Sequence, residues 1–525
     1  MRAGQMTAGG TPAEGLRNGR KPAERMRDGR KRAGWPRFAG AGVAAAGLAG
    51  VTAHWVQRYS APLPTYAALW AAFAAGAWLV LGVSRRRAVP LILLGGLAIQ
   101  VAALSAGPQG SDDLYRYIWD GRVQAAGIDP YHYVPAAPQL TSYRDAFLWP
   151  ASGPYCVGLS SAAAGPAAAG PSPARGRGLP AGCTRINRPR VHTIYPPVAE
   201  AYFTAVAEIS PPGARTLPIQ IAGALLAVAT SVLLVVGLRR LGRDPRFAVF
   251  WAWCPVVGLQ AGNDAHIDVL AAFLTTAALL ILARPARDQR HARRRAIGGG
   301  VLLGLAIATK ITPILAGPAV LRRRPVAVAV AAAAAVGAVY VPHLLVVGSR
   351  VIGFLPGYLA QDGYTAGDRF ALLSLLVPGK WGTLAAVAVL AAVGVAVLRH
   401  ADPGRPWRGA MVMTGAALAV TTPTLLWYSM LLVVFVAMDG RAEWLALAAA
   451  RYLTPLHPLP HQTLPYAAQL GYGGALLVVA AVTLARRIRR PADRPNTPAE
   501  AAGAAGVAGV AGSAARPAPQ PVPAG

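Results

Sequence analysis

This 525-residue chain has few charged residues and very few lysines. Charged residues make up 14% of the sequence, whereas a soluble protein of this length carries about 25%. Lysine occurs only at Lys21, Lys31, Lys310 and Lys380, because arginine has replaced it almost everywhere else. The low charge excludes an ordinary soluble protein, and the Ala, Gly and Arg bias is typical of a bacterial genome rich in G and C.

Several familiar signatures are also missing. We find no phosphate-binding glycine loop, no zinc-type spacing of Cys and His, and no Ser–His–Asp arrangement. No cleavable signal is evident, because the basic, Gly-rich N-terminal arm leads into a multispan array. These absences argue against a nucleotide-dependent enzyme and against a serine hydrolase.

Long apolar runs dominate what remains. The sequence is 54% hydrophobic, and runs of roughly 20 apolar residues recur from residue 38 to residue 485. They predict an all-α polytopic membrane protein. The net charge of +30 does not indicate a nucleic-acid partner, because the arginines cluster at the ends of apolar spans and in the two tails. That distribution is the positive-inside pattern of a membrane protein.

The basic clusters also predict the topology. We expect a disordered cytoplasmic arm at 1–37, a membrane domain at 38–490 and a disordered cytoplasmic tail at 491–525, in a bacterial plasma membrane. The first three spans are expected at 38–56, 65–83 and 88–106. In total the sequence predicts about 11–14 transmembrane helices, with both termini inside.

The third span leads into a long outer region, residues 107–193. Its first half should contain a surface helix at 113–126, which Gly127 and Pro130 end. Its second half, 151–189, is rich in Gly, Pro and Ala and predicts a loop. A short or re-entrant outer helix is expected at 194–209, and two further outer loops at 348–369 and 456–465.

Three later apolar stretches have a polar or proline break in the middle. The breaks fall at 262–268, 309–313 and 421–428. Because basic clusters flank each stretch, each should be a hairpin whose tip points outward, as the outer loop does. Irregular backbone at that depth is tolerated only where it lines a wet cavity.

Adjacent carboxylates open the outer surface helix, in the segment SDDLYRYIWDGR. On a helix Asp112 and Asp113 would point about 100° apart. One would then face the cavity while the other caps the helix. The alternative is that both carboxylates only start the helix.

Polar residues at the first two tips are further candidates. Lys310 lies in an apolar run and would bind a phosphate, or else extend its amine to the membrane surface. His266, Asp268 and Asn263 would bind a phosphate, a sugar hydroxyl or a divalent cation, or else make contacts between helices. The tip alone does not supply enough ligands for a metal, so the need for a metal stays open.

Two arginines and two aromatic residues complete the set. Arg116 and Arg122 flank Asp120, and either would pair with a lipid phosphate or form a structural salt bridge. Trp427 and Tyr428 at the third tip would stack on a sugar or belong to the interfacial aromatic belt.

The three cysteines divide between two environments. Cys156 and Cys183 both fall in the outer loop, an oxidising compartment, and we predict a disulfide between them. Cys254 lies within the membrane and is expected to be a packing residue.

The order of these elements resembles the GT-C membrane glycosyltransferases. The closest similarity is to the bacterial mannosyltransferases that use polyprenol-phosphate mannose, including glycosyltransferase family 87. The catalytic subunit of GPI mannosyltransferase I shows a related arrangement. The matching elements are Asp112 with Asp113, Gly127 with Pro130 and Tyr131, and Tyr195 with Pro196 and Pro197. The chain departs from the pattern in its two full spans before the Asp loop and in the loop between Cys156 and Cys183.

The resemblance implies a GT-C-like bundle and an inverting transfer of a hexose, with mannose as first candidate. The donor would be a polyprenyl-phosphate sugar and the acceptor an extracytoplasmic glycan or lipid. An outer-loop Asp would act as general base, and Asp113 fits best from its spacing to Tyr115 and Tyr117. Lys310, with Arg122, His266 or Arg116, would hold the donor phosphate.

The remaining polar residues, among them Tyr131 and Tyr195, would contact sugar or acceptor. Two alternatives remain open at this point. A flippase or transporter for a lipid-linked sugar would need polar groups through the full bilayer depth. A polymer ligase would need a large late outer loop, and residues 456–465 are few for that.

Overall fold

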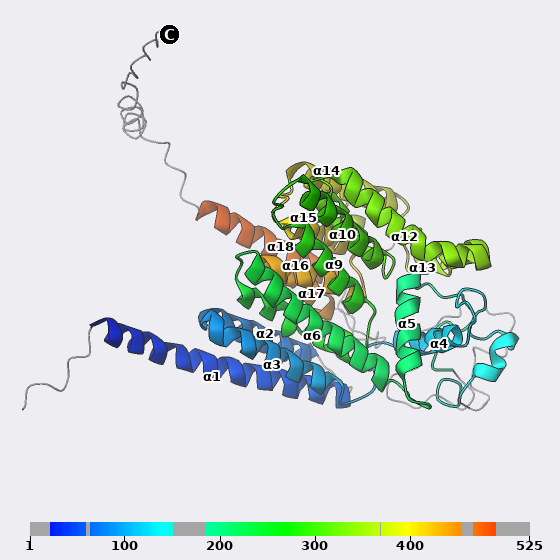
Figure 1. Ribbon diagram of the computed structural model, residues 1–525, viewed down its shortest axis with the longest axis horizontal. Helices are drawn as coiled ribbons and strands as arrows, with labels where there is room; N and C mark the ends of the chain where they lie inside the picture. Colours follow the sequence, from blue (N-terminus) through cyan, green and yellow to red (C-terminus); the bar gives the residue numbers. More distant parts are fainter. Residues whose placement is uncertain (1–21, 59–62, 151–183, 368, 454–465, 490–525) are drawn as a thin grey trace, which may run out of the picture. The chain divides into compact units, whose positions relative to one another are not determined.

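The computed structural model describes residues 22–58, 63–150, 184–367, 369–453 and 466–489 (Figure 1). These residues form helices joined by turns and loops, which confirms the all-α class. Seven of the described helices are long and apolar enough to cross a membrane, or eight if one bent pair is counted. The count is lower than the 11–14 expected, because several arms of the predicted hairpins are short helices. The chain divides into two units, 1–476 and 477–525, and every contact discussed below lies within the first.

The first three spans pack together at the start of the chain. They are α1 (Pro22–Gln57), α2 (Leu63–Gly82) and α3 (Arg85–Ala103). They contain the predicted spans almost entirely, and α1 begins well inside the predicted arm. Gly95 and Gly96 allow a close approach to α3, because an added Cβ on Gly95 would lie 2.7 Å from Nε1 of Trp253. The Trp253 indole then donates to the Ile92 carbonyl at 3.0 Å.

Two short helices, α4 (Asp113–Ala125) and α5 (Pro197–Ile209), form the predicted outer region and pack against each other. Figure 1 shows them side by side, in cyan and green. The predicted surface helix at 113–126 is confirmed to within one residue. Gly127, at φ +81°, follows α4 in the left-handed region that glycine adopts without strain. The expected outer helix at 194–209 is found as α5, whose first turn begins at Pro197.

All three predicted breaks are present. The first lies between the helical segments Pro255–Asn263 and Asp268–Leu282, which meet at 118°. The second follows α10 (Gln289–Ile307) and precedes η5 (Thr312–Ala316). The third follows α15 (Pro406–Thr421), and the helical segment Leu426–Asp439 begins after it.

Further helices are described beyond these. The longest are α6 (Leu217–Arg240), α12 (Pro325–Val347), α14 (Trp381–His400) and α18 (Ala467–Ile488). The predicted outer loop at 348–369 contains η6 (Gly348–Ile352) and α13 (Leu355–Gln361). The predicted loop at 456–465 lies outside the described residues. Contacts between the first, second and third tips bring α4, α9 (Asp268–Leu282) and α16 (Met430–Asp439) to one place.

Candidate active site

Asp113 begins α4, and its carboxylate is held by a residue far along the chain. The side-chain amide of Asn187 donates to Oδ1 of Asp113 at 2.6 Å and to Oδ1 of Asp112 at 3.0 Å. The other oxygen of Asp113 lies 3.8 Å from Nδ1 of His266. The Asp113 side chain remains 18% exposed. One carboxylate oxygen is therefore fixed by Asn187, and the other faces His266.

The surroundings of Asp113 raise its proton affinity. Burial, and then the negative charge of Asp112, raise the pKa of the Asp113 carboxyl above its usual range. The positive charges of Lys310 and Arg188 and the Asn187 amide act in the opposite direction. A carboxylate with a raised pKa is a stronger base than an ordinary aspartate, and such perturbed groups cluster at functional sites.

His266 connects this carboxylate to the third tip. Its imidazole is fully buried and stacks on the indole of Trp427, with ring centroids 3.6 Å apart. The Tyr117 hydroxyl lies 3.4 Å from Nδ1 of His266. His266 thus lies between α4 and the tip at 421–428, as the shared sidedness of these segments predicts.

Lys310 is paired with Asp268 across the first two tips. Its amine donates to Oδ2 of Asp268 at 2.9 Å and lies 5.3 Å from the centre of the Tyr428 ring. The Tyr428 hydroxyl is 2.6 Å from the Tyr358 hydroxyl. The structure therefore brings together the Asp113, His266, Asp268, Lys310, Trp427 and Tyr428 side chains that the sequence singled out.

Asn263 and its neighbour Asp264 hold the loop before α4. The Asn263 amide donates to the carbonyls of Ala103 and Gly107, both at 3.0 Å, and accepts from the backbone N–H of Gln109 at 2.9 Å. Asp264 accepts from the Gly110 N–H at 2.6 Å. These bonds use both ends of the Asn263 amide, so we propose no sugar-binding role for this residue.

Arg116 forms a structural salt bridge, which was the alternative to pairing with a lipid phosphate. Its guanidinium Nε contacts both carboxylate oxygens of Asp120 at 2.8 Å, and both side chains are buried. Beside them Glu200 accepts from the Thr193 hydroxyl at 2.7 Å. Burial and the nearby Asp120 charge raise the pKa of Glu200 well above its usual range.

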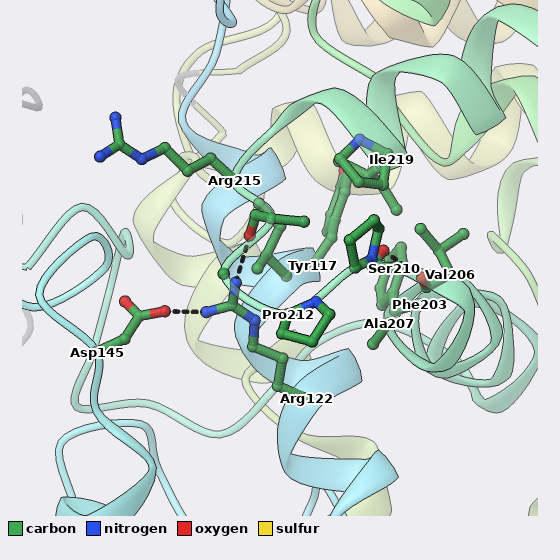
Figure 2. A pocket seen from close by; sticks show the side chains of 15 residues that line it. Tyr117, Arg122, Asp145, Phe203, Val206, Ala207, Ser210, Pro212, Arg215 and Ile219 are labelled. Carbon is green, nitrogen blue, oxygen red and sulfur yellow. Dashed lines mark hydrogen bonds and ion pairs between the residues drawn. The ribbon is translucent and has the colours of Figure 1, made fainter.

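Arg122 lies in a separate pocket. It follows Asp113 by more than two helical turns, and its guanidinium donates to Asp145 and to the Ala214 carbonyl (Figure 2). The pocket has a volume of about 320 Å³ and lies at the ends of α5 and α6. Tyr117 lines it and also approaches His266, so its ring forms part of the wall between the pocket and the candidate site. The structure thus places Arg122 apart from Asp113 and Lys310.

Tyr131 and Tyr195 join the outer region together. The fully buried Tyr131 hydroxyl donates to the Tyr195 carbonyl at 2.6 Å. The Tyr195 ring packs edge-on against Tyr117, with centroids 4.9 Å apart. The Tyr117 ring thus contacts both Tyr195 and His266. The bond from Tyr131 to Tyr195 connects the segment after α4 with the segment before α5.

Neither Asn187 nor Arg188 was among the candidates predicted from the sequence. Arg188 has a left-handed backbone, at φ +46°, and its Nε donates to Gln361 at 3.2 Å. Their one sequence signal is position, since they are polar residues at the end of the predicted Gly/Pro-rich loop at 151–189. Cys156 and Cys183 lie outside the described residues, so their disulfide stays a prediction. Within the described ranges, no group of three or more His, Cys, Asp or Glu side chains is placed to hold a metal ion.

Comparison with known proteins gives one match. Residues 193–423 match the family model of glycosyltransferase family 87. The matched region begins at Thr193, just after Asn187, and contains the first two tips and the start of the third, but neither Asp113 nor Trp427. No curated protein and no solved structure matches the chain. The match confirms the resemblance drawn from the sequence, and together with the apolar helices it indicates a polytopic membrane glycosyltransferase similar to family 87.

Proposed function

We propose that this glycosyltransferase moves a hexose, with mannose as first candidate, from a polyprenyl-phosphate donor to an extracytoplasmic glycan or lipid acceptor with inversion. The observation that carries the proposal is the Asp113 carboxylate. One of its oxygens is held by Asn187, the other faces His266, and the charge of Lys310 is near enough to affect its pKa. In a bacterial plasma membrane the basic turns would face the cytoplasm and this site the outside.

Asp113 is the proposed general base. An acceptor hydroxyl would approach the carboxylate oxygen that Asn187 does not bind. As the acceptor oxygen bonds to the anomeric carbon, its proton passes to Asp113 and the bond between that carbon and the phosphate oxygen breaks. The electron pair leaves with the polyprenyl phosphate. A single displacement of this kind inverts the anomeric carbon and needs no second carboxylic acid, because phosphate is a good leaving group.

Lys310 and Arg188 are the proposed cations for the donor phosphate. Both act on the pKa of Asp113 through their charge, so both lie within electrostatic range of the reacting centre. Cations there would stabilise the negative charge that grows on the phosphate as the sugar leaves. Lys310 would exchange part of its contact with Asp268 for the phosphate, which frees the Asp268 carboxylate to accept from a sugar hydroxyl.

The aromatic residues of the third tip are the proposed sugar platform. Trp427 uses one face for His266, and Tyr428 lies beside Lys310. An aromatic ring next to a phosphate site would pack against the apolar face of a pyranose. Tyr195, behind Tyr117, would complete the wall on the side of α5.

A membrane assay with labelled polyprenyl-phosphate mannose tests these roles. We expect Asp113→Asn to lower transfer by roughly 100-fold or more, as loss of a general base does. Asp112→Asn should have a smaller effect, and Lys310→Met should weaken use of the donor. Glu208→Gln is the matched control, because it removes one exposed carboxylate from α5 without touching the site. Near-normal transfer by both Asp variants would refute the catalytic role.

A further inference from the structure

A second cavity lies at the opposite ends of α3 and α6 from the candidate active site. It has a volume of about 310 Å³, and we call it the basic cavity. Four of its six lining residues are arginines and none is acidic; the six are Arg85, Arg86, Arg239, Gly242, Arg243 and Pro245. Because α3 has 19 residues, about 28 Å of helix separates this cavity from the loop before Asp113.

Local structure directs these arginines to one place. Arg85 and Arg86 begin α3, where the helix dipole adds positive charge and Ser84 makes no side-chain cap. Arg239 lies in the last turn of α6, which is followed by Gly242 at φ +66°. That left-handed turn lets the Arg243 N–H return to the Leu238 carbonyl at 2.8 Å, which brings the Arg243 side chain back towards α3.

Nearby carboxylates do not neutralise this charge. Asp244 binds chiefly Arg246, at 2.6 Å, and lies 3.6 Å from Arg85. Asp439 lies 3.6 Å from Arg243 but is shared with two other arginines that are nearer. Burial, and then the charges of neighbouring arginines, lower the pKa of Arg243. The cluster therefore carries an excess of positive charge that an anion would relieve.

Arg86 and Arg239 form no ion pair with the described residues. On each helix, an exposed row of apolar side chains, here called a stripe, leads to the arginine. Along α3, Pro90 and the 65% exposed Leu94 follow Arg86 at intervals of four residues. Along α6, Val236 and Val232 precede Arg239 by three and seven residues, and both are exposed. These spacings place each stripe on the same helix face as its arginine.

We propose that the basic cavity binds the phosphate of an anionic phospholipid, whose acyl chains lie along the exposed faces of α3 and α6. The cavity takes the headgroup, and the two stripes take the hydrocarbon. A free phosphate ion would use only the arginines and would leave the stripes without a role. Because basic turns face the cytoplasm, the lipid belongs to the inner leaflet. This inference is independent of the transferase mechanism.

The test uses the purified full-length chain in detergent with three added probes. They are dioleoylphosphatidylglycerol, dioleoylphosphatidylcholine and inorganic phosphate. We expect only phosphatidylglycerol to raise the midpoint of thermal unfolding and to remain bound in native mass spectrometry. The double variant Arg86→Gln/Arg239→Gln should weaken its binding by roughly tenfold. The control Arg293→Gln/Arg294→Gln removes the same charge from exposed positions outside the cavity and should bind as the wild type does.

Each other outcome counts against the proposal. Equal binding of phosphatidylcholine would show that charge does not matter, and an equal effect of inorganic phosphate would show a site for a free anion. Unchanged phosphatidylglycerol binding by the double variant would show that the lipid binds outside the basic cavity. If the double variant does not fold, the two single variants carry the same test, because both side chains are exposed. Arg86→Lys/Arg239→Lys keeps the charge and should retain most of the binding.

Discussion

The imidazole of His266 lies nearly flat on the indole of Trp427, with ring planes inclined by 23°. The two residues come from different broken segments, so their stack fixes one tip against the other. His266 also faces Asp113. The position of the proposed base therefore depends on an aromatic contact made far along the chain.

Replacing Trp427 tests this dependence. Trp427→Ala removes the surface on which His266 rests, and a displacement of about 1 Å at a reacting centre can cost about 100-fold in rate. We expect Trp427→Ala to lower transfer by that order and Trp427→Phe to retain most of it, measured as single-turnover transfer in membranes. Trp381→Ala is the control, because Trp381 is 54% exposed. Equal activity of Trp427→Ala and wild type would show that the stack does not position the site.

Removing Asn187 should shift the pH dependence of transfer. The Asn187 amide lowers the pKa of Asp113, so Asn187→Ala should raise that pKa further. A general base works only when deprotonated, so the acid limb of the pH–rate profile should move to higher pH. Full pH–rate profiles of both enzymes give the measurement.

Two companion variants sharpen that experiment. Arg188→Gln removes a positive charge that also lowers the pKa of Asp113, and it should move the acid limb in the same direction. Arg144→Gln removes a cation that is not among the groups with the largest effects on this pKa, and it should leave the limb in place. If the acid limb of Asn187→Ala stays at the wild-type pH, the Asn187 amide does not affect the pKa of the catalytic base.

Glu200 makes stability depend on pH. Its folded pKa is raised well above 4.5, so the folded state binds this proton more tightly than the unfolded state. The stability that it contributes is fully present below pH 4.5 and is lost as pH rises through the folded pKa. Glu200→Gln cannot titrate but can still accept from Thr193, so unfolding midpoints should fall less with rising pH. Glu208→Gln, on the exposed face of α5, should keep the wild-type slope. Parallel curves for Glu200→Gln and wild type would contradict this assignment.

Gly121 allows α4 to touch α5. An added Cβ there would lie 2.4 Å from the Phe203 carbonyl oxygen, which belongs to rigid backbone. We expect Gly121→Ala to separate the helices and to lower the free energy of unfolding by about 1–3 kcal/mol. Gly298→Ala in α10 meets nothing within 4 Å and should be neutral or slightly stabilising. Thermal unfolding of the two variants compares them, and similar midpoints would show that the α4–α5 contact is loose.

Local patterns in the sequence predicted much of the fold. Helix α4 was placed to within one residue because its carboxylates, Gly127 and Pro130 mark both ends. The breaks at the three tips were found because polar residues and proline interrupt apolar runs. The number of crossings stays a prediction, because seven described helices are long enough to cross a membrane and the short arms of the hairpins are not counted among them.

The site was harder to predict for a different reason. Asn263 and His266 occur in the same polar tip, and the sequence does not distinguish them. Only the structure shows that Asn263 satisfies backbone groups of the preceding loop while His266 faces Asp113. Asn187 was missed because its importance comes from spatial proximity to two carboxylates, which no spacing in the sequence reveals.

The bonds from Asn263 and Asp264 to the loop before α4 have a consequence for biosynthesis. The ribosome releases Asp113 long before the tip at 262–268, and the Trp427 tip follows later still. A nascent chain that has inserted only its first spans therefore lacks every group that holds the proposed base in place. Transfer activity should arise only after the third tip has entered the membrane, so an incompletely translated chain would be inert towards the donor lipids that surround it.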